Sequence, residues 1–374
     1  MKEENYRLAV QLRHELHAHP ELSCQEKWTK QHIIDFLRAN TKNIEVYDRG
    51  AWCYGVYRGK EGGRKLGFRA DFDALPIPET IDLPYGSQCP GVSHKCGHDG
   101  HSATLALLAL ETDQRGSDNT VYFIFQHAEE IGAGGRDCAV LVEEEGIDEV
   151  FGYHNCAGVP LGTVVVKDGS MACASMGMSL YFKGVTTHAS APGLGRSAAP
   201  AISRIILALP ELFRAEDYEG MTLATVIQVD MGEPAFGTAA ANGVLRLTIR
   251  GSIEKEMYIL RDKINAMAHA LACEYGLDFS VEYCDYFPEN VNHKESSDKV
   301  RAVAAKLGYP LVEKQFPDSG SEDFGYFTKY TRGAYFNVGA GVNAPDIHTV
   351  VYDFNDELMK YASSVFAELA ELKE

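Results

Sequence analysis

The sequence predicts an α/β protein of two domains, in which a mixed-sheet α/β domain carries an inserted α+β domain. The chain has 374 residues, more than the roughly 250–300 at which one hydrophobic core usually stops growing. Continuous apolar runs typical of strands buried on both faces alternate with helical patterns, as in residues 120–125. Between residues 175 and 287 the pattern changes to the order β-α-β-β-α-β, the ferredoxin-like arrangement. We therefore expect residues 1–174 and 288–374 to form one discontinuous domain around an inserted domain of residues 175–287.

The elements of the discontinuous domain follow from apolar spacing and from the positions of proline. Leu8, Leu12 and Leu16 recur at helical spacing before Pro20, which predicts a helix over 6–19. Further helices are expected over 25–39, 104–110, 298–307 and 355–371. Strands are expected from residue 65 to before Pro76, and over 120–125, 149–153 and 334–338.

The inserted domain is predicted from the same signals. We expect strands over 176–184, 221–229, 244–251 and 278–283. Helices are expected over 198–214 and 254–275. These six elements complete one ferredoxin-like unit, which is why the segment is interpreted as a domain of its own.

Charge and composition exclude several classes of protein. The formal net charge of −18 disfavours attraction to nucleic acid or to an anionic membrane surface. No apolar run approaches the ~20 residues of a membrane helix, and the charged N-terminus does not resemble a secretory signal. Nine cysteines without regular spacing favour reduced thiols, so we expect a cytoplasmic protein.

The most informative stretch of the chain is residues 93–108, which places one cysteine and three histidines within residues 94–101. Cys96 and His98 are one residue apart, so a thiolate and an imidazole can reach the same side of a turn and bind a metal ion. The alternative is a glycine-bearing turn whose Cys and His are simply buried. The spacing matches no zinc-finger framework, so any further ligands must come from other segments.

Polar side chains also follow successive predicted strands. Asp71 and Asp73 follow the first strand, Glu129 and Glu130 the second, and His154 the third. Ligands of open α/β sheets bind at the carboxyl ends of strands, so we expect these side chains to share one chemistry. Each has a structural alternative, such as a solvated loop cap or a hydrogen-bonded histidine.

Taken in order, these segments resemble the M20 family of metallopeptidases, in the aminoacylase and amidohydrolase branch that includes hippurate and indole-acetyl-amino-acid hydrolases. The resemblance covers nearly the whole chain and rests on HAHPELSCQE, RADFDALPIPE, HKCGHDGHSATLALL, FQHAEEIGAGG, YHNCAGVPLG, THASAP, SEDFGYF and IHTVVYDFNDE. It implies hydrolysis of the amide bond of N-acyl-amino acids or related small amides. It also implies a homodimer formed through the inserted lid domain.

The resemblance further implies the roles of individual residues. Two divalent metal ions would be held by Cys96, His98, Glu130, His154 and His348. Glu129 would be the general base, His188 the lid histidine and Asn242 the residue that binds the substrate carboxylate. Considered alone, His188 is more typical of an incidental loop residue, and Asn242 beside a glycine is typical of a turn.

The sequence departs from the family pattern at two places. Position 127 is His where members of this branch usually have Pro, and Asn242-Gly243-Val244-Leu245 replaces the usual Asn-Val-Ile-Pro. Both changes bear on substrate preference more than on the reaction. The imidazole of His127 is expected near Glu129 and Glu130, as a polar contact or an additional ligand.

The residue types are suited to one mechanism. Amide hydrolysis at neutral pH needs an activated water, and a divalent metal ion lowers the pKa of a water molecule to about 7. A ligand set of Cys, His and carboxylate suits zinc, and manganese, cobalt and nickel are alternatives. Asp71 and Asp99 are expected to support the ligands, whereas His101 fits a helix-capping role equally well. Dipeptidase or carboxypeptidase activity, and a binding protein without catalysis, are the alternative functions.

Overall fold

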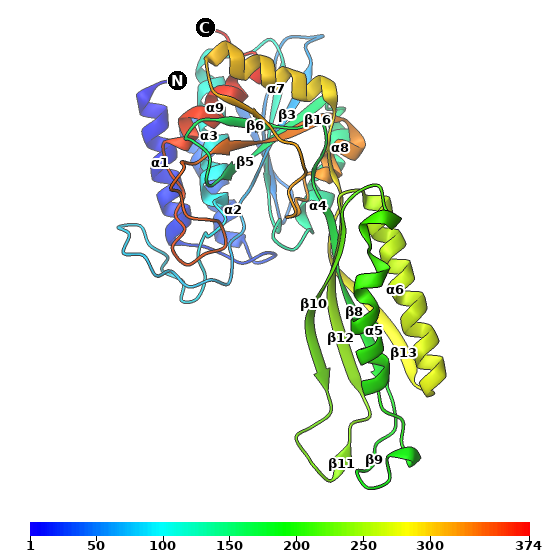
Figure 1. The fold of residues 1–374 in the computed structure, drawn as a ribbon. Coiled ribbons are helices and arrows are strands. Elements are labelled where there is room, and N and C mark those ends of the chain that lie inside the picture. The colour runs from blue at the N-terminus through cyan, green and yellow to red at the C-terminus, as the bar shows by residue number, and fades with distance from the viewer. The chain divides into compact units, whose positions relative to one another are not determined.

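The computed structural model describes residues 1–374 and divides into two compact units (Figure 1). Unit 1 comprises Met1–Met171, Asn290–Pro317 and Asp323–Glu374, and unit 2 comprises Ala172–Glu289 and Asp318–Glu322. The borders expected from the sequence, 175 and 287, differ slightly from these and leave Asp318–Glu322 outside the inserted domain. That segment belongs to unit 2 because the amide of Cys173 donates to the carbonyls of Asp318 and Gly320.

Unit 1 is built on one mixed sheet of eight strands in the order β1-β2-β4-β3-β5-β16-β6-β15. The four neighbouring strands β4, β3, β5 and β16 run parallel, whereas β2 is antiparallel to β4 and β6 to β16. The carboxyl ends of the parallel strands therefore lie along one edge of the sheet. The strands are β1 Ile44–Asp48, β2 Cys53–Tyr57, β3 Lys65–Asp71, β4 Thr120–Gln126, β5 Glu149–Cys156, β6 Val164–Val166, β15 Leu311–Glu313 and β16 Arg332–Gly339.

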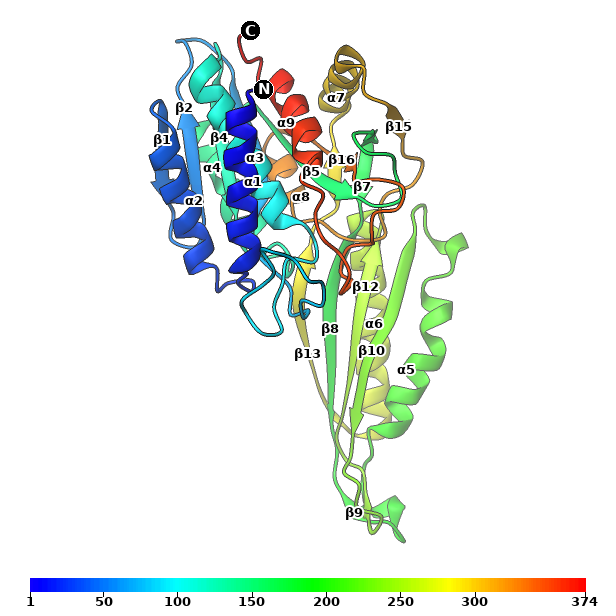
Figure 2. The same ribbon diagram turned by 90° about the vertical axis from the view of Figure 1, so that its left-hand side faces the viewer.

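Helices cover both faces of this sheet and form two hydrophobic cores (Figure 2). The larger core joins one face to α1, α2, α3, α7 and α9, and the smaller core joins the other face to α4 and α8. Central strands such as β3 and β4 are consequently buried on both sides, which explains their continuous apolar sequences. The helices are α1 Glu3–Ala18, α2 Lys27–Asn40, α3 His98–Arg115, α4 Gly134–Glu145, α7 Lys294–Leu307, α8 Gly325–Tyr330 and α9 Leu358–Leu369, and β7 Gly169–Ala172 pairs with β14 Asn290–Asn292.

Unit 2 has the expected ferredoxin-like topology. Its antiparallel sheet has the order β10-β12-β8-β13, and α5 and α6 pack on one face of it. Alternate residues of β12 are buried against these helices, so the strand has one buried and one partly exposed face. The elements are β8 Ala174–Lys183, β9 Thr187–His188, α5 Ala199–Leu212, β10 Thr222–Met231, β11 Thr238–Ala239, β12 Gly243–Gly251, α6 Glu254–Tyr275 and β13 Asp278–Phe287, with two 3₁₀ turns at Pro192–Leu194 and Ala215–Asp217.

The α/β fold class predicted from the sequence is confirmed, and the differences concern bounds and short elements. The helix expected over 104–110 begins six residues earlier, at His98. This start was not predicted because α3 is buried almost all round, and its first turn has no apolar stripe that would mark it as helical. His154 lies within β5 instead of after it, since this strand continues to Cys156. No helix of the structure combines the length and the apolar character needed to cross a bilayer.

Candidate metal centre

A glycine in a left-handed conformation creates the turn between Cys96 and His98. Gly97 has φ +106°, and a Cβ atom there would lie 2.4 Å from Asn155 Oδ1 and 2.5 Å from the Tyr352 hydroxyl. Only glycine fits this backbone and this space without displacement. The turn places His98 as the first residue of α3, and Cys96 is buried two residues earlier.

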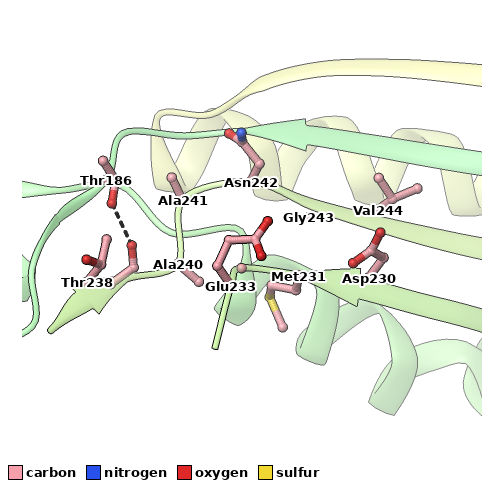
Figure 3. Close-up of a pocket in the computed structure, with 12 residues that line it drawn as sticks. Thr186, Asp230, Met231, Glu233, Thr238, Ala240, Ala241, Asn242, Gly243 and Val244 are labelled. Carbon is pink, nitrogen blue, oxygen red and sulfur yellow. Dashed lines mark hydrogen bonds between the residues drawn. The ribbon is translucent and has the colours of Figure 1, made fainter. Parts of the chain in front are cut away.

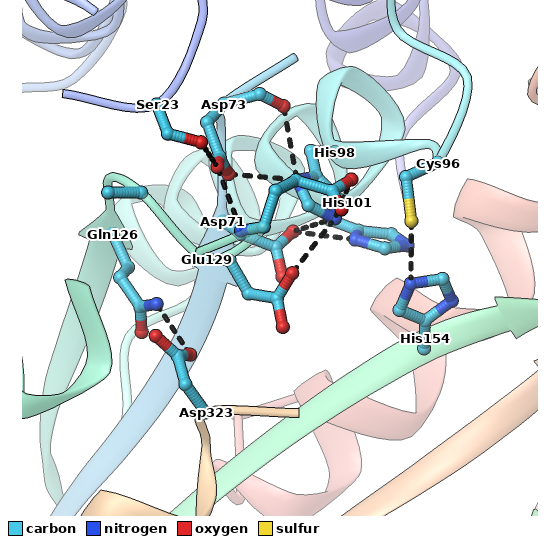
Figure 4. A network of polar contacts seen from close by, with 12 residues as sticks. Ser23, Asp71, Asp73, Cys96, His98, His101, Gln126, Glu129, His154 and Asp323 are labelled. Atoms are coloured by element: carbon cyan, nitrogen blue, oxygen red, sulfur yellow. Dashed lines mark hydrogen bonds and ion pairs between the residues drawn. The ribbon is translucent and has the colours of Figure 1, made fainter. Parts of the chain in front are cut away.

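The side chains expected at the carboxyl ends of the strands converge on this turn (Figure 4). His98 Nε2 lies 3.9 Å from Asp71 Oδ1, 3.8 Å from Glu129 Oε2 and 3.8 Å from Glu130 Oε1. Cys96 Sγ lies 3.4 Å from His154 Nε2. The ends of three parallel strands and the turn before α3 therefore bring a thiol, imidazoles and carboxylates from four segments into one site.

Several overlapping groups of these side chains have ligand atoms close enough for one ion to bind. Their ligand atoms lie within 4.8 Å of one another in the groups Cys96–His98–His154, Cys96–Glu130–His348 and His98–Glu129–Glu130. Cys96, His98 and Glu130 each belong to two of these three groups, so the groups share ligand atoms. His348 comes from the loop between β16 and α9, and its Nε2 lies 3.5 Å from Glu130 Oε2.

Unpaired buried atoms indicate that a cation fits this site. His98 Nε2 and Glu130 Oε1 are buried and have no hydrogen-bond partner. Such atoms are costly to bury unless they bind a ligand. A soft thiol, imidazoles and a carboxylate together form a donor set suited to zinc or a similar divalent ion.

The pKa shifts of Cys96 and Glu130 also indicate that a cation fits this site. Burial raises the pKa of Glu130 to about 7. Burial and the nearby Glu130 raise the pKa of the Cys96 thiol well above its usual value. Positive charge at this site would stabilise the thiolate and the carboxylate, which are the forms that bind metal ions.

Two buried aspartates beside the candidate ligands, Asp71 and Asp73, make hydrogen bonds that orient residues of the site. Asp73 Oδ1 lies 3.0 Å from His98 Nδ1, and Asp73 Oδ2 accepts from the Glu130 amide at 3.0 Å. Asp71 accepts from Arg69 at 2.7 Å and lies 2.7 Å from His101 Nδ1. One aspartate thus fixes the ring of His98 and the main chain of Glu130, as carboxylates near metal ligands commonly do.

Two candidate residues belong to unit 2: His188 lies in β9, and Asn242 lies directly before β12. Asn242 accepts a hydrogen bond from the Gly184 amide at 3.1 Å and lines a pocket of about 300 Å³ with Asp230 and Glu233 (Figure 3). His188 is exposed, with Nδ1 at 2.7 Å from Ser190 Oγ. The approach of His188 and Asn242 to the candidate ligands stays a prediction.

Comparison with known proteins identifies the family. Residues 67–372 match the pattern described as Peptidase family M20/M25/M40. The chain belongs to this family. The match extends from β3 to the end of the chain, and so includes all the candidate ligands in unit 1 as well as the whole of unit 2.

Relatives of this M20 family member are similar over almost their whole length. N-acetylcysteine deacetylase of Bacillus subtilis is 31% identical over 368 residues, which cover 96% of this chain and 95% of the relative. Hippurate hydrolase of Campylobacter jejuni is 30% identical, with coverage of 96% and 94%. The crystal structure of a dinuclear metal-binding M20 peptidase from Bacillus subtilis superposes with a TM-score of 0.83 at 28% identity, and covers 99% of this chain and 98% of that one.

The expected ligands of this M20 family member gather in one site, and two other residues expected there, Asp99 and His127, have partners outside the possible ligand groups. The carboxylate of Asp99 accepts from Arg13 at 2.9 Å and lies 2.8 Å from His17, so it ties α3 to α1. The buried ring of His127 belongs to none of the possible ligand groups, and its Nε2 lies 3.8 Å from Asp137.

The contacts of two further buried residues, Asp73 and His101, define roles that the sequence left open. Asp73 was expected near the end of the first strand. Its contacts with His98 and Glu130 join segments that are far apart in the sequence and meet only in the folded chain. His101 lies 2.7 Å from both Asp71 Oδ1 and Asn155 Oδ1, which favours the hydrogen-bonded role over that of a ligand.

Proposed function

We propose that this chain is a two-metal amidohydrolase that cleaves the amide bond of N-acyl-amino acids. The observation that carries the proposal is that Cys96 belongs to two possible ligand groups, while Glu129 lies beside them. The activities for which the two relatives are named, deacetylation of N-acetylcysteine and hydrolysis of hippurate, both cleave an acyl group from an amino-acid nitrogen.

The proposed ligands divide into two sets. Cys96, His98 and His154 would hold one divalent ion, and Cys96, Glu130 and His348 the other. A dinuclear centre in a structural relative of the same family supports this count. Zinc or manganese fits the mixed donor set, with cobalt or nickel as alternatives.

The protein residues then have distinct tasks. Bound divalent ions supply the electrophile that polarises the amide and acidifies water. Glu129 takes the proton of the attacking water and transfers it to the leaving nitrogen, because Glu130 is engaged as a ligand and is a poor base. His98 is held by Asp73 and so keeps Nε2 directed at the centre.

Unit 2 supplies the recognition of substrate in this proposal. Asn242 binds the carboxylate of the amino-acid part, and His188 stabilises the developing oxyanion when unit 2 closes. His127 and the segment Asn242-Gly243-Val244-Leu245 would then influence the preference for acyl group or amino acid.

We further propose that two copies associate through the edge strand β10. This strand lies at the edge of the unit 2 sheet, and Leu223, Val226, Ile227, Val229 and Met231 are exposed on it. Exposed edge strands with apolar side chains are favourable sites for pairing with another chain. A cytoplasmic location is supported by the nine cysteines, all of which are free thiols.

The test is turnover of a substrate panel by protein of defined metal content. Metal would be removed with chelator and then zinc, manganese, cobalt or nickel restored separately, before assay with N-acyl-amino acids and dipeptides. We expect restored hydrolysis of N-acyl-amino acids, and a kcat about 10²–10⁴-fold lower in Glu129→Gln with metal content unchanged.

Glu143→Gln is the matched control, because Glu143 is an exposed carboxylate on α4. It should retain wild-type kcat. Hydrolysis confined to dipeptides would favour the dipeptidase alternative. Metal-loaded wild type that binds N-acyl-amino acids without turnover would contradict an enzymatic role.

A further inference from the structure

The loop that carries His348 has no regular secondary structure to hold it in place. It lies between the end of β16 at Gly339 and the start of α9 at Leu358. His348 itself has a positive φ of 61°, which is unfavourable for a residue with a Cβ atom. Its side chain is 49% exposed, so packing contributes little to its position. The position of this imidazole therefore depends on what binds the main chain of its loop.

A buried lysine binds the main chain of this loop at two points. The carbonyl of Lys95 accepts from the amide of His348 at 2.6 Å, and its ammonium donates to the carbonyl of Tyr352 at 2.8 Å. The same ammonium donates to Glu79 Oε1 at 2.5 Å. Lys95 is fully buried, which is unusual for lysine and requires such partners. One residue next to Cys96 thus holds the loop at two points.

Glu79 is itself fixed by a buried network that returns to the same loop. Its second oxygen lies 2.8 Å from His17 Nε2, and His17 Nδ1 lies 2.8 Å from Asp99 Oδ2. Arg13 donates to Asp99 at 2.9 Å and also to the carboxylate of Asp353, one residue after Tyr352. Burial opposes ionisation of Glu79, but hydrogen bonds from His17 and Lys95 lower its pKa to about 2. The partner of Lys95 is therefore charged at neutral pH.

We propose that Lys95 is a positioning residue that fixes the His348 loop against the Cys96 turn and so sets the affinity for one of the two cations. The affected cation is the one assigned to Cys96, Glu130 and His348. The contacts of the Lys95 ammonium are a carboxylate and a main-chain carbonyl, so it acts through the loop. This inference rests on the two-metal function proposed above.

The test is calorimetric titration of metal-free protein with zinc alone. Lys95→Met removes the ammonium and retains the length of the side chain. Because this change leaves His17 as the remaining side-chain partner of Glu79, Lys95→Met/Glu79→Gln serves as a second variant without the carboxylate charge. Lys65→Met is the matched control, since the Lys65 ammonium also donates to a main-chain carbonyl, that of Glu145, at 2.5 Å.

We expect wild type and Lys65→Met to bind two zinc ions per chain. Both Lys95 variants should bind one ion as tightly as wild type and the other about 10–100-fold more weakly, the usual effect of losing a residue that orients a ligand. Equal affinity for both ions in the variants and wild type would overturn the inference, as would equal weakening of both ions. Wild type that binds fewer than two ions would instead refute the two-metal function on which the inference rests.

Discussion

At the scale of single residues, the candidate centre depends on Gly97. Its left-handed φ and the 2.4 Å approach of Asn155 Oδ1 leave no space for a side chain between Cys96 and His98. We predict that Gly97→Ala destabilises the protein by about 1–3 kcal/mol from backbone strain alone. The clash with Asn155 should add to this loss and displace Cys96, so that zinc affinity falls as well.

The measurement is thermal unfolding together with zinc binding, with Gly62→Ala as control. Gly62 also has a positive φ, +80°, but a Cβ atom there would contact nothing within 4 Å. The control should lose only the strain component and keep wild-type zinc affinity. If Gly97→Ala bound zinc as wild type does, the turn would not be needed to place the ligands.

Residue types and their order in the sequence predicted most of this site, and the fold supplied the rest. Cys96, His98, Glu130 and His154 were predicted as ligands and lie together in the structure, although their binding of metal stays a prediction. The role of Asp73 was not predictable, because its bonds to His98 and Glu130 exist only when β3, β4 and α3 are packed.

At the scale of elements, strand β10 determines the proposed association of two chains. We predict that Ile227→Asp dissociates the dimer, because Ile227 is 61% exposed on this edge strand and a charge there opposes burial. Sedimentation equilibrium should show two chains for wild type and one for the variant. Leu207→Asp on α5, where Leu207 is 80% exposed, is the control and should remain dimeric. A wild type that sediments as a single chain would contradict the proposal.

Long elements were easier to predict than short ones. The helix expected over 254–275 coincides with α6, because its apolar periodicity extends over many turns. The three-residue strands β6 and β15 were not predicted, since each has too few residues to show a period. The His348 loop has no periodic signal either, and its conformation depends on Lys95, which lies more than 250 residues away in sequence.

At the scale of the whole molecule, the chain combines a metal-binding α/β unit with a ferredoxin-like unit, as its order of sequence patterns predicted. Membership of the M20 family agrees with both units, because the family match includes each of them. The net charge of −18 is compatible with small-molecule substrates and does not favour nucleic acid.

Anomalous diffraction from crystals grown with zinc tests whether Cys96 joins two cation sites. We predict two zinc peaks per chain, both bonded to the Cys96 sulfur, one also bonded to His98 and His154 and the other to Glu130 and His348. A single peak, or a pair of peaks with no bond to Cys96, would contradict the account.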